Sequence, residues 1–241
     1  MRKKESKNII RVENVQKTFE VNPELQVQAL KDISFSVKKG QFLSIMGPSG
    51  SGKSTLLYIL GGLDDPTAGK IWIDTKPLSK MSAKDKSLLK RRDIGFIFQF
   101  YNLVPNLTVE DNILLPLILD GKNIKDYQEK LDTLLKKIGI RDKREAYPNE
   151  LSGGQQQRVA IARALIIEPK VILADEPIGN LDSKNGQAVM ELLKKINQEE
   201  ETTIVQVTHS EESAEYGSHV LHMKDGVIIE HKKTDRELKK D

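Results

Sequence analysis

Short apolar runs rich in β-branched residues recur along the chain and predict strands, because such side chains pack well on a pleated surface. The predicted strands are Ile9–Val15, Ile33–Val37, Phe42–Met46, Ile71–Ile73, Ile94–Gln99, Val171–Ala174, Thr203–Thr208 and His219–Met223. Helical patterns alternate with these strands, which predicts an α/β fold with a mainly parallel sheet. The N-terminal strands have no helices between them, so we expect a separate antiparallel sheet beside the parallel core.

Two further patterns complete the predicted architecture. Lys224-Asp225-Gly226 followed by Val227–Glu230 predicts a hairpin after the last parallel strand. A helical insertion is predicted between Gln99 and Val171, where one helix face is apolar and the opposite face is charged. Its apolar face comprises Ile124, Tyr127, Leu131, Leu134, Leu135 and Ile138. A second helix is predicted from Ser152 to about Ile167, with Pro169 stopping it.

The composition limits the class of protein. The chain has 241 residues and 27.2 kDa, with 30% charged and 38% hydrophobic residues and a mean hydropathy of −0.45. The longest apolar run, Ile113–Leu119, is far shorter than the roughly 20 residues of a membrane span. The polar residues at the beginning of the sequence, Met1–Glu5, predict no secretion signal. The absence of cysteine excludes disulfides, zinc–thiolate sites and thiol nucleophiles.

The net charge of +3 lies at the ends of the chain. Residues 1–8 carry +3 and residues 232–241 carry +2, so the body between them carries −2. A nucleic-acid-binding protein concentrates positive charge on its folded surface, so no nucleic-acid partner is expected. The tails are interpreted as solvated ends, with a weak contact to a membrane surface as the alternative.

The segment Gly47–Ser54 fits the phosphate-loop pattern G-x-x-x-x-G-K-S/T at every fixed position. It follows the strand Phe42–Met46 and precedes an apolar helical run, which is the context that this motif requires. Its glycines let backbone N–H groups surround a phosphate at the positive end of a helix. Lys53 is expected to reach the β and γ phosphates, and Ser54 to bind Mg²⁺. The alternative is a flexible turn. The expected phosphate-binding residues are Gly47, Ser49, Gly50, Ser51, Gly52, Lys53, Ser54 and Thr55.

Two acidic residues, Asp175 and Glu176, follow the apolar run Val171–Ala174. The carboxyl ends of strands line the ligand crevice of an open α/β sheet. We therefore expect Asp175 to hold Mg²⁺ and Glu176 to polarise an attacking water. Taken alone, two acidic residues after a buried strand more often only mark the point where the chain leaves the hydrophobic core.

The segment Leu151–Gln155 (LSGGQ) begins a helix with two glycines, which leaves backbone N–H groups free for a second anion. A simple helix start with Ser152 as N-cap would fit equally well. With this segment, residues 9 to 230 resemble the ATP-binding cassette family of transporter ATPases. The resemblance rests on five elements in family order: Gly47–Ser54, Gln99, Leu151–Gln155, Val171–Glu176 and His209.

This resemblance implies a P-loop NTPase (RecA-like) domain formed by the whole chain, with ATP and Mg²⁺ as cofactors. Its core would be about 1–98 and 160–230, its helical subdomain about 99–159, and its basic tails 1–8 and 232–241. The family pairs two subunits head to tail, so Ser152, Gly154 and Gln155 are expected to contact the ATP of a second copy.

Single residues also take expected roles from the resemblance. Gln99 matches a glutamine that touches Mg²⁺, and His209 matches a histidine that contacts the γ-phosphate. Phe19 occupies the place of an adenine-stacking aromatic, with a core side chain as the alternative. The catalytic candidates are thus Glu176, His209, Lys53 and Gln99, and the metal candidates are Ser54, Gln99 and Asp175.

The segment Phe96–Asn112 and Gly61-Gly62-Leu63-Asp64 resemble one branch of the family, that of lipoprotein-release, macrolide-efflux and peptide-antibiotic-resistance systems. This implies an integral membrane permease partner, attachment at the cytoplasmic face of the membrane, and export or extraction of an antimicrobial compound, peptide or lipoprotein. The apolar stretch Phe100 to Leu107 suits either a groove for a permease helix or an internal packing loop.

Other functions remain as alternatives. An antibiotic-sensing complex would use the same ATPase parts. A DNA-repair ATPase is disfavoured because no sustained heptad repeat interrupts the chain. A translation-factor cassette protein would carry two copies of the LSGGQ segment, and this chain has one. A non-hydrolysing binding module is disfavoured because Lys53, Asp175, Glu176 and His209 are all present.

Overall fold

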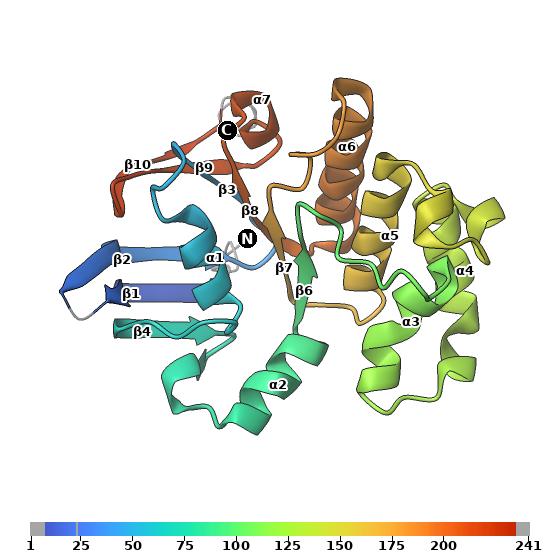
Figure 1. Ribbon diagram of the computed structural model, residues 1–241, viewed down its shortest axis with the longest axis horizontal. Helices are drawn as coiled ribbons and strands as arrows, with labels where there is room; N and C mark the ends of the chain where they lie inside the picture. The colour runs from blue at the N-terminus through green and yellow to red at the C-terminus, as the bar shows by residue number, and fades with distance from the viewer. Residues whose placement is uncertain (1–7, 23, 235–241) are drawn as a thin grey trace, which may run out of the picture.

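A computed structural model describes residues 8–22 and 24–234 of the protein (Figure 1). The strands are β1 (Asn8–Asn22), β2 (Leu25–Lys38), β3 (Phe42–Met46), β4 (Ala68–Ile73), β5 (Lys76–Pro77), β6 (Ile94–Ile97), β7 (Val171–Asp175), β8 (Thr203–Thr208), β9 (His219–Lys224) and β10 (Val227–Lys233). The α-helices are α1 (Lys53–Leu60), α2 (Ala83–Arg92), α3 (Val109–Leu119), α4 (Gln128–Lys137), α5 (Gly153–Leu165), α6 (Ser183–Glu200) and α7 (Glu211–Ala214). Single 3₁₀ turns are η1 (Leu78–Lys80), η2 (Ile124–Tyr127), η3 (Arg141–Lys143) and η4 (Pro148–Glu150).

The core of the molecule is a six-stranded sheet in the order β10-β9-β3-β8-β7-β6. Its strands pair in parallel from β9 through β6, and only β10 is antiparallel to its neighbour. Every residue of β3, β7 and β8 is buried. Strands that are covered on both faces have continuous apolar runs in their sequence. For this reason these segments were predicted with almost correct bounds.

The N-terminal strands form a second, antiparallel sheet in the order β2-β1-β4-β5, as predicted. Helix α1 packs between the two sheets, because its buried leucines and isoleucine share one hydrophobic cluster with both. Alternate residues of β7 point to opposite faces: Val171 and Leu173 join this cluster, whereas Ile172 and Ala174 join the cluster on the other side. Helix α1 and the phosphate loop before it are therefore fixed from both sheets.

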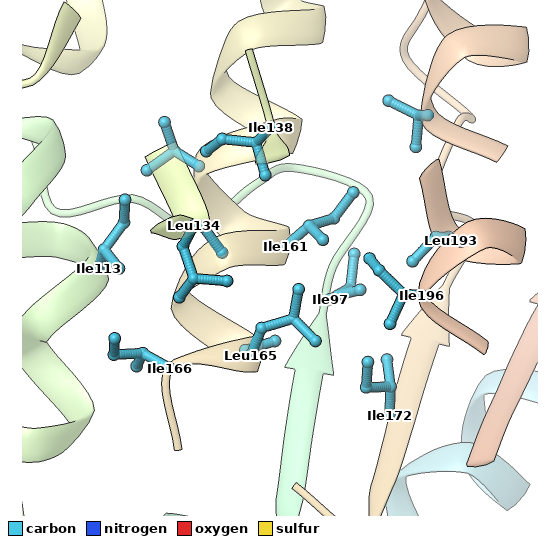
Figure 2. Packing of buried hydrophobic residues seen from close by; sticks show 14 of the residues in the cluster. Ile97, Ile113, Leu134, Ile138, Ile161, Leu165, Ile166, Ile172, Leu193 and Ile196 are labelled. Atoms are coloured by element: carbon cyan, nitrogen blue, oxygen red, sulfur yellow. The ribbon is translucent and has the colours of Figure 1, made fainter. Parts of the chain in front are cut away.

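Helices α5 and α6 cover the other face of the six-stranded sheet, with α3 and α4 beyond them (Figure 1). Figure 2 shows Ile161 and Leu165 of α5 between the helical insertion, represented by Ile113 and Leu134, and Ile172 of the sheet. Since α5 contributes to both parts through one continuous cluster, it joins the helical insertion to the core.

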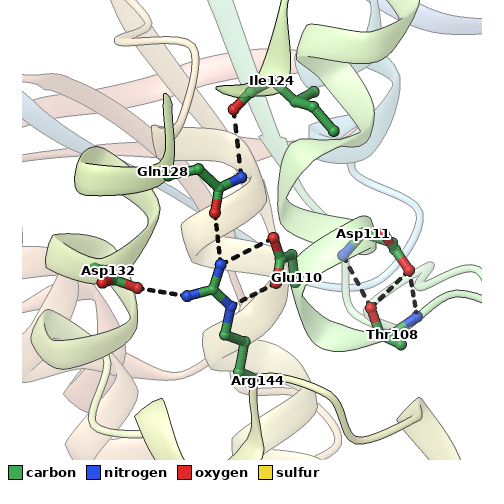
Figure 3. A network of polar contacts seen from close by, with 7 residues as sticks. All are labelled: Thr108, Glu110, Asp111, Ile124, Gln128, Asp132 and Arg144. Carbon is green, nitrogen blue, oxygen red and sulfur yellow. Dashed lines mark hydrogen bonds and ion pairs between the residues drawn. The ribbon is translucent and has the colours of Figure 1, made fainter. Parts of the chain in front are cut away.

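A network of polar contacts around Arg144 holds the helical insertion together (Figure 3). Its guanidinium donates to Asp132 at 2.7 Å and to Gln128 at 2.6 Å, both on α4, and to Glu110 of α3 at 3.0 Å. The bonds to Glu110 are the main cause that raises the pKa of Arg144. Gln128 in turn donates to the carbonyl of Ile124 at 3.3 Å. One planar guanidinium thus fixes α3 against α4.

Several element bounds differ from the sequence prediction. Strand β6 ends at Ile97, so Gln99 lies in the loop that follows. Helix α5 begins at Gly153 with Ser152 as its N-cap, and the predicted boundary at residue 159 falls within this helix. Lys232 and Lys233, expected in a solvated tail, pair with β9 because the hairpin continues past Glu230. Residues 1–7 and 235–241 of the basic tails lie outside the described residues.

Other elements had no counterpart in the prediction. Helix α3 begins at a capping box between Thr108 and Asp111 and covers the apolar run that ends at Leu119 (Figure 3). Helices α2 and α6 and the two-residue strand β5 were also unassigned. Within the described ranges, no helix is long and apolar enough to cross a membrane.

Candidate nucleotide-binding site

The loop between β3 and α1 borders a pocket of about 290 Å³. Its lining residues are Ala29, Ser49, Gly50, Gly52, Lys53, Ser54, Thr55 and Glu176. Gly50 and Gly52 adopt φ angles of +79° and +92°, which favour glycine over residues with a Cβ atom. A Cβ atom at Gly52 would also lie 2.5 Å from the Ala29 carbonyl oxygen. The two glycines are therefore required by the backbone that forms the pocket.

Lys53 opens α1 and is largely buried at the wall of this pocket. Its Nζ donates to the carbonyl oxygens of Gly47 and Pro48 at 2.8 and 2.9 Å. Burial lowers the pKa of Lys53, while the nearby carboxylates of Glu176 and Asp175 act in the opposite direction. The loop thus places a cation beside two acidic groups at the start of a helix.

Ser51 belongs to the same loop but is buried and does not line the pocket. Its Oγ is buried and has no hydrogen-bond partner among the described residues. A buried hydroxyl without a partner is costly, so Ser51 is a strained point of the loop.

Asp175 ends β7 and accepts two hydrogen bonds from α1. Ser54 Oγ donates to Asp175 Oδ1 at 2.9 Å, and Tyr58 Oη donates to Asp175 Oδ2 at 2.7 Å. Burial and this bond to Asp175 raise the pKa of Tyr58 to about 12. Tyr58 was missed in the sequence, although its position one helical turn after Ser54 placed it on the same face of α1. The loop serine and the strand aspartate are thus brought together.

Glu176 follows Asp175 and adopts a φ of +44°, an uncommon value for a residue with a side chain. Its backbone N–H donates to the Val207 carbonyl at 3.0 Å, which ties it to β8. Its Oε2 lies 2.9 Å from Nδ1 of His209, which follows the same strand. Glu176 lines the pocket and is mostly buried, whereas the side chain of His209 is 64% exposed.

Gln99 lies beside Glu176 through contacts that the sequence did not indicate. Its Nε2 donates to Asn180 Oδ1 at 3.3 Å, and Asn180 Nδ2 donates to the Gln99 carbonyl at 3.1 Å. A Cβ atom at Gly179 would lie 2.8 Å from Gln99 Nε2 and 3.2 Å from Glu176 Oε2. Asn180 therefore holds the loop after β6 against the loop after β7. The resemblance placed Asn180-Leu181-Asp182 in a loop between the two sites of a dimer, but it did not indicate this contact with Gln99.

Other predicted residues lie away from this pocket. Ser152 caps α5, where its Oγ accepts from the N–H of Gln155 at 3.3 Å, and neither residue lines the pocket. The same holds for Gly154. Phe19, on β1, is 40% exposed and lies under Lys17, whose Nζ is 4.8 Å from the ring centroid. The alternative of a core side chain at Phe19 does not agree with this exposure.

A strand, a glycine-rich phosphate loop and a helix, with two acids at the end of a parallel strand two places away in the same sheet, define a P-loop nucleotide-binding fold. Residues 30–179 match the sequence profile of the family described as ABC transporter. The chain is 50% identical over 221 residues to the lipoprotein-releasing system ATP-binding protein LolD of Aquifex aeolicus, covering 92% of this chain and 96% of that protein.

Two other relatives extend the comparison. The chain is 44% identical over 221 residues to the macrolide export ATP-binding/permease protein MacB of Brucella melitensis, covering 92% of this chain and 34% of that longer protein. A solved dimeric structure of the ATP-binding cassette MJ0796 in a post-hydrolysis state, bound to ADP and Pi, matches with a TM-score of 0.85 and 42% identity. It covers 93% of this chain and 98% of that one. A protein carrying the name MJ0796 is known from Methanocaldococcus jannaschii.

The chain belongs to the ABC transporter family and is an ATP-binding ATPase. The predicted fold class and family are thereby confirmed.

Proposed function

We propose that the chain binds ATP with Mg²⁺ in the pocket after β3, pairs head to tail with a second copy, and drives a separate integral membrane permease from the cytoplasmic face of the membrane. The observation that carries this proposal is the convergence on one pocket of Lys53, the Ser54–Asp175 pair and the Glu176–His209 pair. These groups supply a phosphate-binding cation, hard oxygen ligands and a carboxylate next to a histidine.

The residues fit the nucleotide and its metal. Gly50 and Gly52 line the pocket without side chains, and Lys53 offers its ammonium group to a phosphate. Mg²⁺ prefers oxygen ligands and usually takes only one or two from protein, completing its shell with phosphate and water oxygens. Ser54 and Asp175 would provide these, with the Gln99 side chain nearby. When bound, the metal would neutralise charge on the phosphates.

In the proposed reaction, Glu176 accepts a hydrogen bond from the water that attacks the γ-phosphate, and His209 fixes the orientation of the carboxylate through Nδ1. Both groups are held by the ends of adjacent strands, so their geometry is set by the sheet. Lys53 stabilises negative charge on the transferred phosphoryl group.

A second copy is needed because the residues of the LSGGQ segment lie away from the pocket of their own chain. Ser152, Gly154 and Gln155 stand at the N-terminus of α5 and do not line the pocket of their own chain. A helix N-terminus with two glycines is suited to an anion. In the proposed dimer it contacts the ATP held by the partner. The dimeric structures of the MJ0796 cassette support the pairing of two copies.

The similarity to LolD and to the ATPase part of MacB supports a permease partner and the export or extraction of a lipoprotein, peptide or antimicrobial compound. The exposed apolar side chains of Phe100 (73%) and Val104 (37%), in the loop after Gln99, supply a surface for a permease segment.

The test contrasts two substitutions in the pocket. Glu176→Gln keeps the shape of the pocket and should retain ATP affinity while turnover falls by about a hundredfold or more. Lys53→Ala removes the ammonium group and should weaken ATP binding itself. Equilibrium binding of a fluorescent ATP analogue and release of phosphate separate the two effects. Hydrolysis near the wild-type rate in Glu176→Gln would overturn the assignment.

A further inference from the structure

Gln157 is a fully buried polar residue on α5 with one half of its amide unpaired. Its Nε2 donates to the Pro177 carbonyl oxygen at 2.7 Å, whereas its Oε1 has no hydrogen-bond partner among the described residues. The orientation of the amide is fixed, because the carbonyl can only accept and therefore requires the NH₂ group. An amide kept in the interior at the cost of an unpaired oxygen calls for an explanation.

The residue that Gln157 contacts directly follows Glu176. The chain turns sharply there: Gly179 N–H donates to the Glu176 carbonyl at 2.9 Å, and Glu176 itself has a φ of +44°. The bond from Gln157 anchors the Pro177 carbonyl inside this turn. The backbone that orients the Glu176 carboxylate is thus held from one side by β8, through Val207, and from the other side by α5.

The same face of α5 also packs closely against the start of α6. Gly154 lies three residues before Gln157 and therefore on the same side of the helix. A Cβ atom at Gly154 would be 2.6 Å from Asn185 Oδ1, so α5 and the start of α6 are in close contact there. Movement of the N-terminus of α5 therefore reaches the turn at Pro177 through the buried hydrogen bond of Gln157.

We infer that Gln157 is a positioning residue that couples the N-terminal turn of α5 to the carboxylate of Glu176 in the same chain. The inference rests on the proposed function, in which Ser152 and Gly154 contact the ATP of the partner while Glu176 acts on the ATP of its own chain. Gln157 then makes the orientation of Glu176 depend on occupancy of the partner's site. Cooperative hydrolysis of the two ATP molecules of the dimer is the expected consequence.

The first test is Gln157→Met, which keeps the length and apolar stem of the side chain but cannot donate to Pro177. We expect kcat to fall by about tenfold to a hundredfold, the range produced by small misplacements of a reacting group. ATP affinity of the monomer should stay unchanged because Gln157 does not line the pocket. The Hill coefficient for ATP should fall from about 2 towards 1.

Gln156→Met is the matched control. Gln156 is the adjacent residue on α5, but its Nε2 donates to the Leu151 carbonyl at 3.2 Å and not to the turn after Glu176. Because this bond does not reach Pro177, Gln156→Met should lower kcat and cooperativity far less than Gln157→Met does. Equal behaviour of the two variants would overturn the role of Gln157.

A double substitution separates positioning from a general loss of stability. In the Glu176→Gln background, single-turnover hydrolysis should fall little further when Gln157→Met is added, because residues that act as one unit are not additive. If Gln157→Met lowered the single-turnover rate by the same factor in this background as in wild type, Gln157 would act independently of Glu176.

Gln157→Glu covers the case in which Gln157→Met does not fold. A protonated carboxyl can donate to Pro177, whereas an ionised one cannot, and burial favours the protonated form. Its turnover relative to wild type should rise several-fold from pH 8 to pH 6, and a flat ratio would contradict the inference. Failure of the proposed function gives a different result, since the wild-type chain itself would then hydrolyse no ATP or Glu176→Gln would stay active.

Discussion

His209 Nδ1 lies 2.9 Å from Glu176 Oε2, a contact that joins the ends of the adjacent parallel strands β8 and β7. The two side chains differ in their surroundings, because Glu176 lines the pocket while most of His209 is exposed. The histidine can therefore orient the carboxylate and also approach a ligand from the open side.

The first prediction concerns this pair. His209→Ala should lower kcat by about a hundredfold, since Glu176 loses the group that orients it, while ATP affinity changes little. His222→Ala is the control, because His222 contacts Glu230 on the β9–β10 hairpin at 3.7 Å. Phosphate-release assays under saturating ATP measure the effect. A His209→Ala variant as active as His222→Ala would contradict the orienting role.

The second prediction uses the bond between Tyr58 and Asp175. Tyr58→Phe removes a donor to a buried carboxylate and should lower the free energy of unfolding by about 1 kcal/mol. The pKa of Tyr58 is about 12 in the folded chain and 10.0 in a model peptide. The folded state thus holds this proton more tightly, so the stabilisation is complete below pH 10 and is lost as the pH rises through 12.

Urea unfolding of Tyr58→Phe and wild type at several pH values measures this difference. The gap between the two midpoints should be constant from pH 7 to 9 and should close in more alkaline solution. Tyr147→Phe, at a tyrosine that is 46% exposed, is the control and should leave the midpoint unchanged. An equal midpoint for Tyr58→Phe at pH 7 would show that the bond to Asp175 does not stabilise the fold.

Local sequence sufficed for the parts of the fold in which every residue faces the core. Phe42–Met46 and Thr203–Thr208 were predicted with correct bounds because both faces of these strands are covered. Strand β5 could not be found, because Lys76 and Pro77 have low strand propensity and are held by pairing with β4. Strand β1 extends beyond its apolar core because pairing with β2 continues through several bulges.

The candidate site likewise contains residues that local sequence identifies and residues that it does not. The phosphate loop and Asp175-Glu176 were found because their spacing and context are local. The contacts of Asn180 with Gln99 and of Gln157 with Pro177 were not foreseen, because they join residues that are 81 and 20 positions apart. The expected stacking of Phe19 on adenine stays a prediction, since the residue lies outside the lining of the pocket.

The third prediction concerns the dimer. Glu176→Gln with ATP and Mg²⁺ should form dimers, because ATP that is not hydrolysed stays at the interface and stabilises the pair. Adding Ser152→Asp should abolish them: aspartate still caps α5, but its charge repels the partner's phosphates. Ser82→Asp, at the N-cap of α2, is the matched control and should leave the dimer intact. Light scattering that finds dimers with Ser152→Asp, or monomers throughout, would contradict the head-to-tail arrangement.

The last prediction concerns the permease. Phe100 is 73% exposed and contributes little to the core, whereas Leu103, three residues later, packs against the main hydrophobic cluster. If a permease segment covers this loop, Phe100→Ser should leave the melting temperature and ATP affinity unchanged and weaken capture of the permease by about tenfold, since a buried aromatic anchor is worth more than 1 kcal/mol. Leu103→Ser is the contrasting variant and should lower the melting temperature by several degrees, because it removes buried apolar area.

The loop also begins at Gln99, so permease binding should alter ATP turnover of wild type more than that of Phe100→Ser. Pull-down from detergent-solubilised membranes, paired with melting curves, measures both variants. Full capture by a stable Phe100→Ser chain would move the docking surface away from this loop.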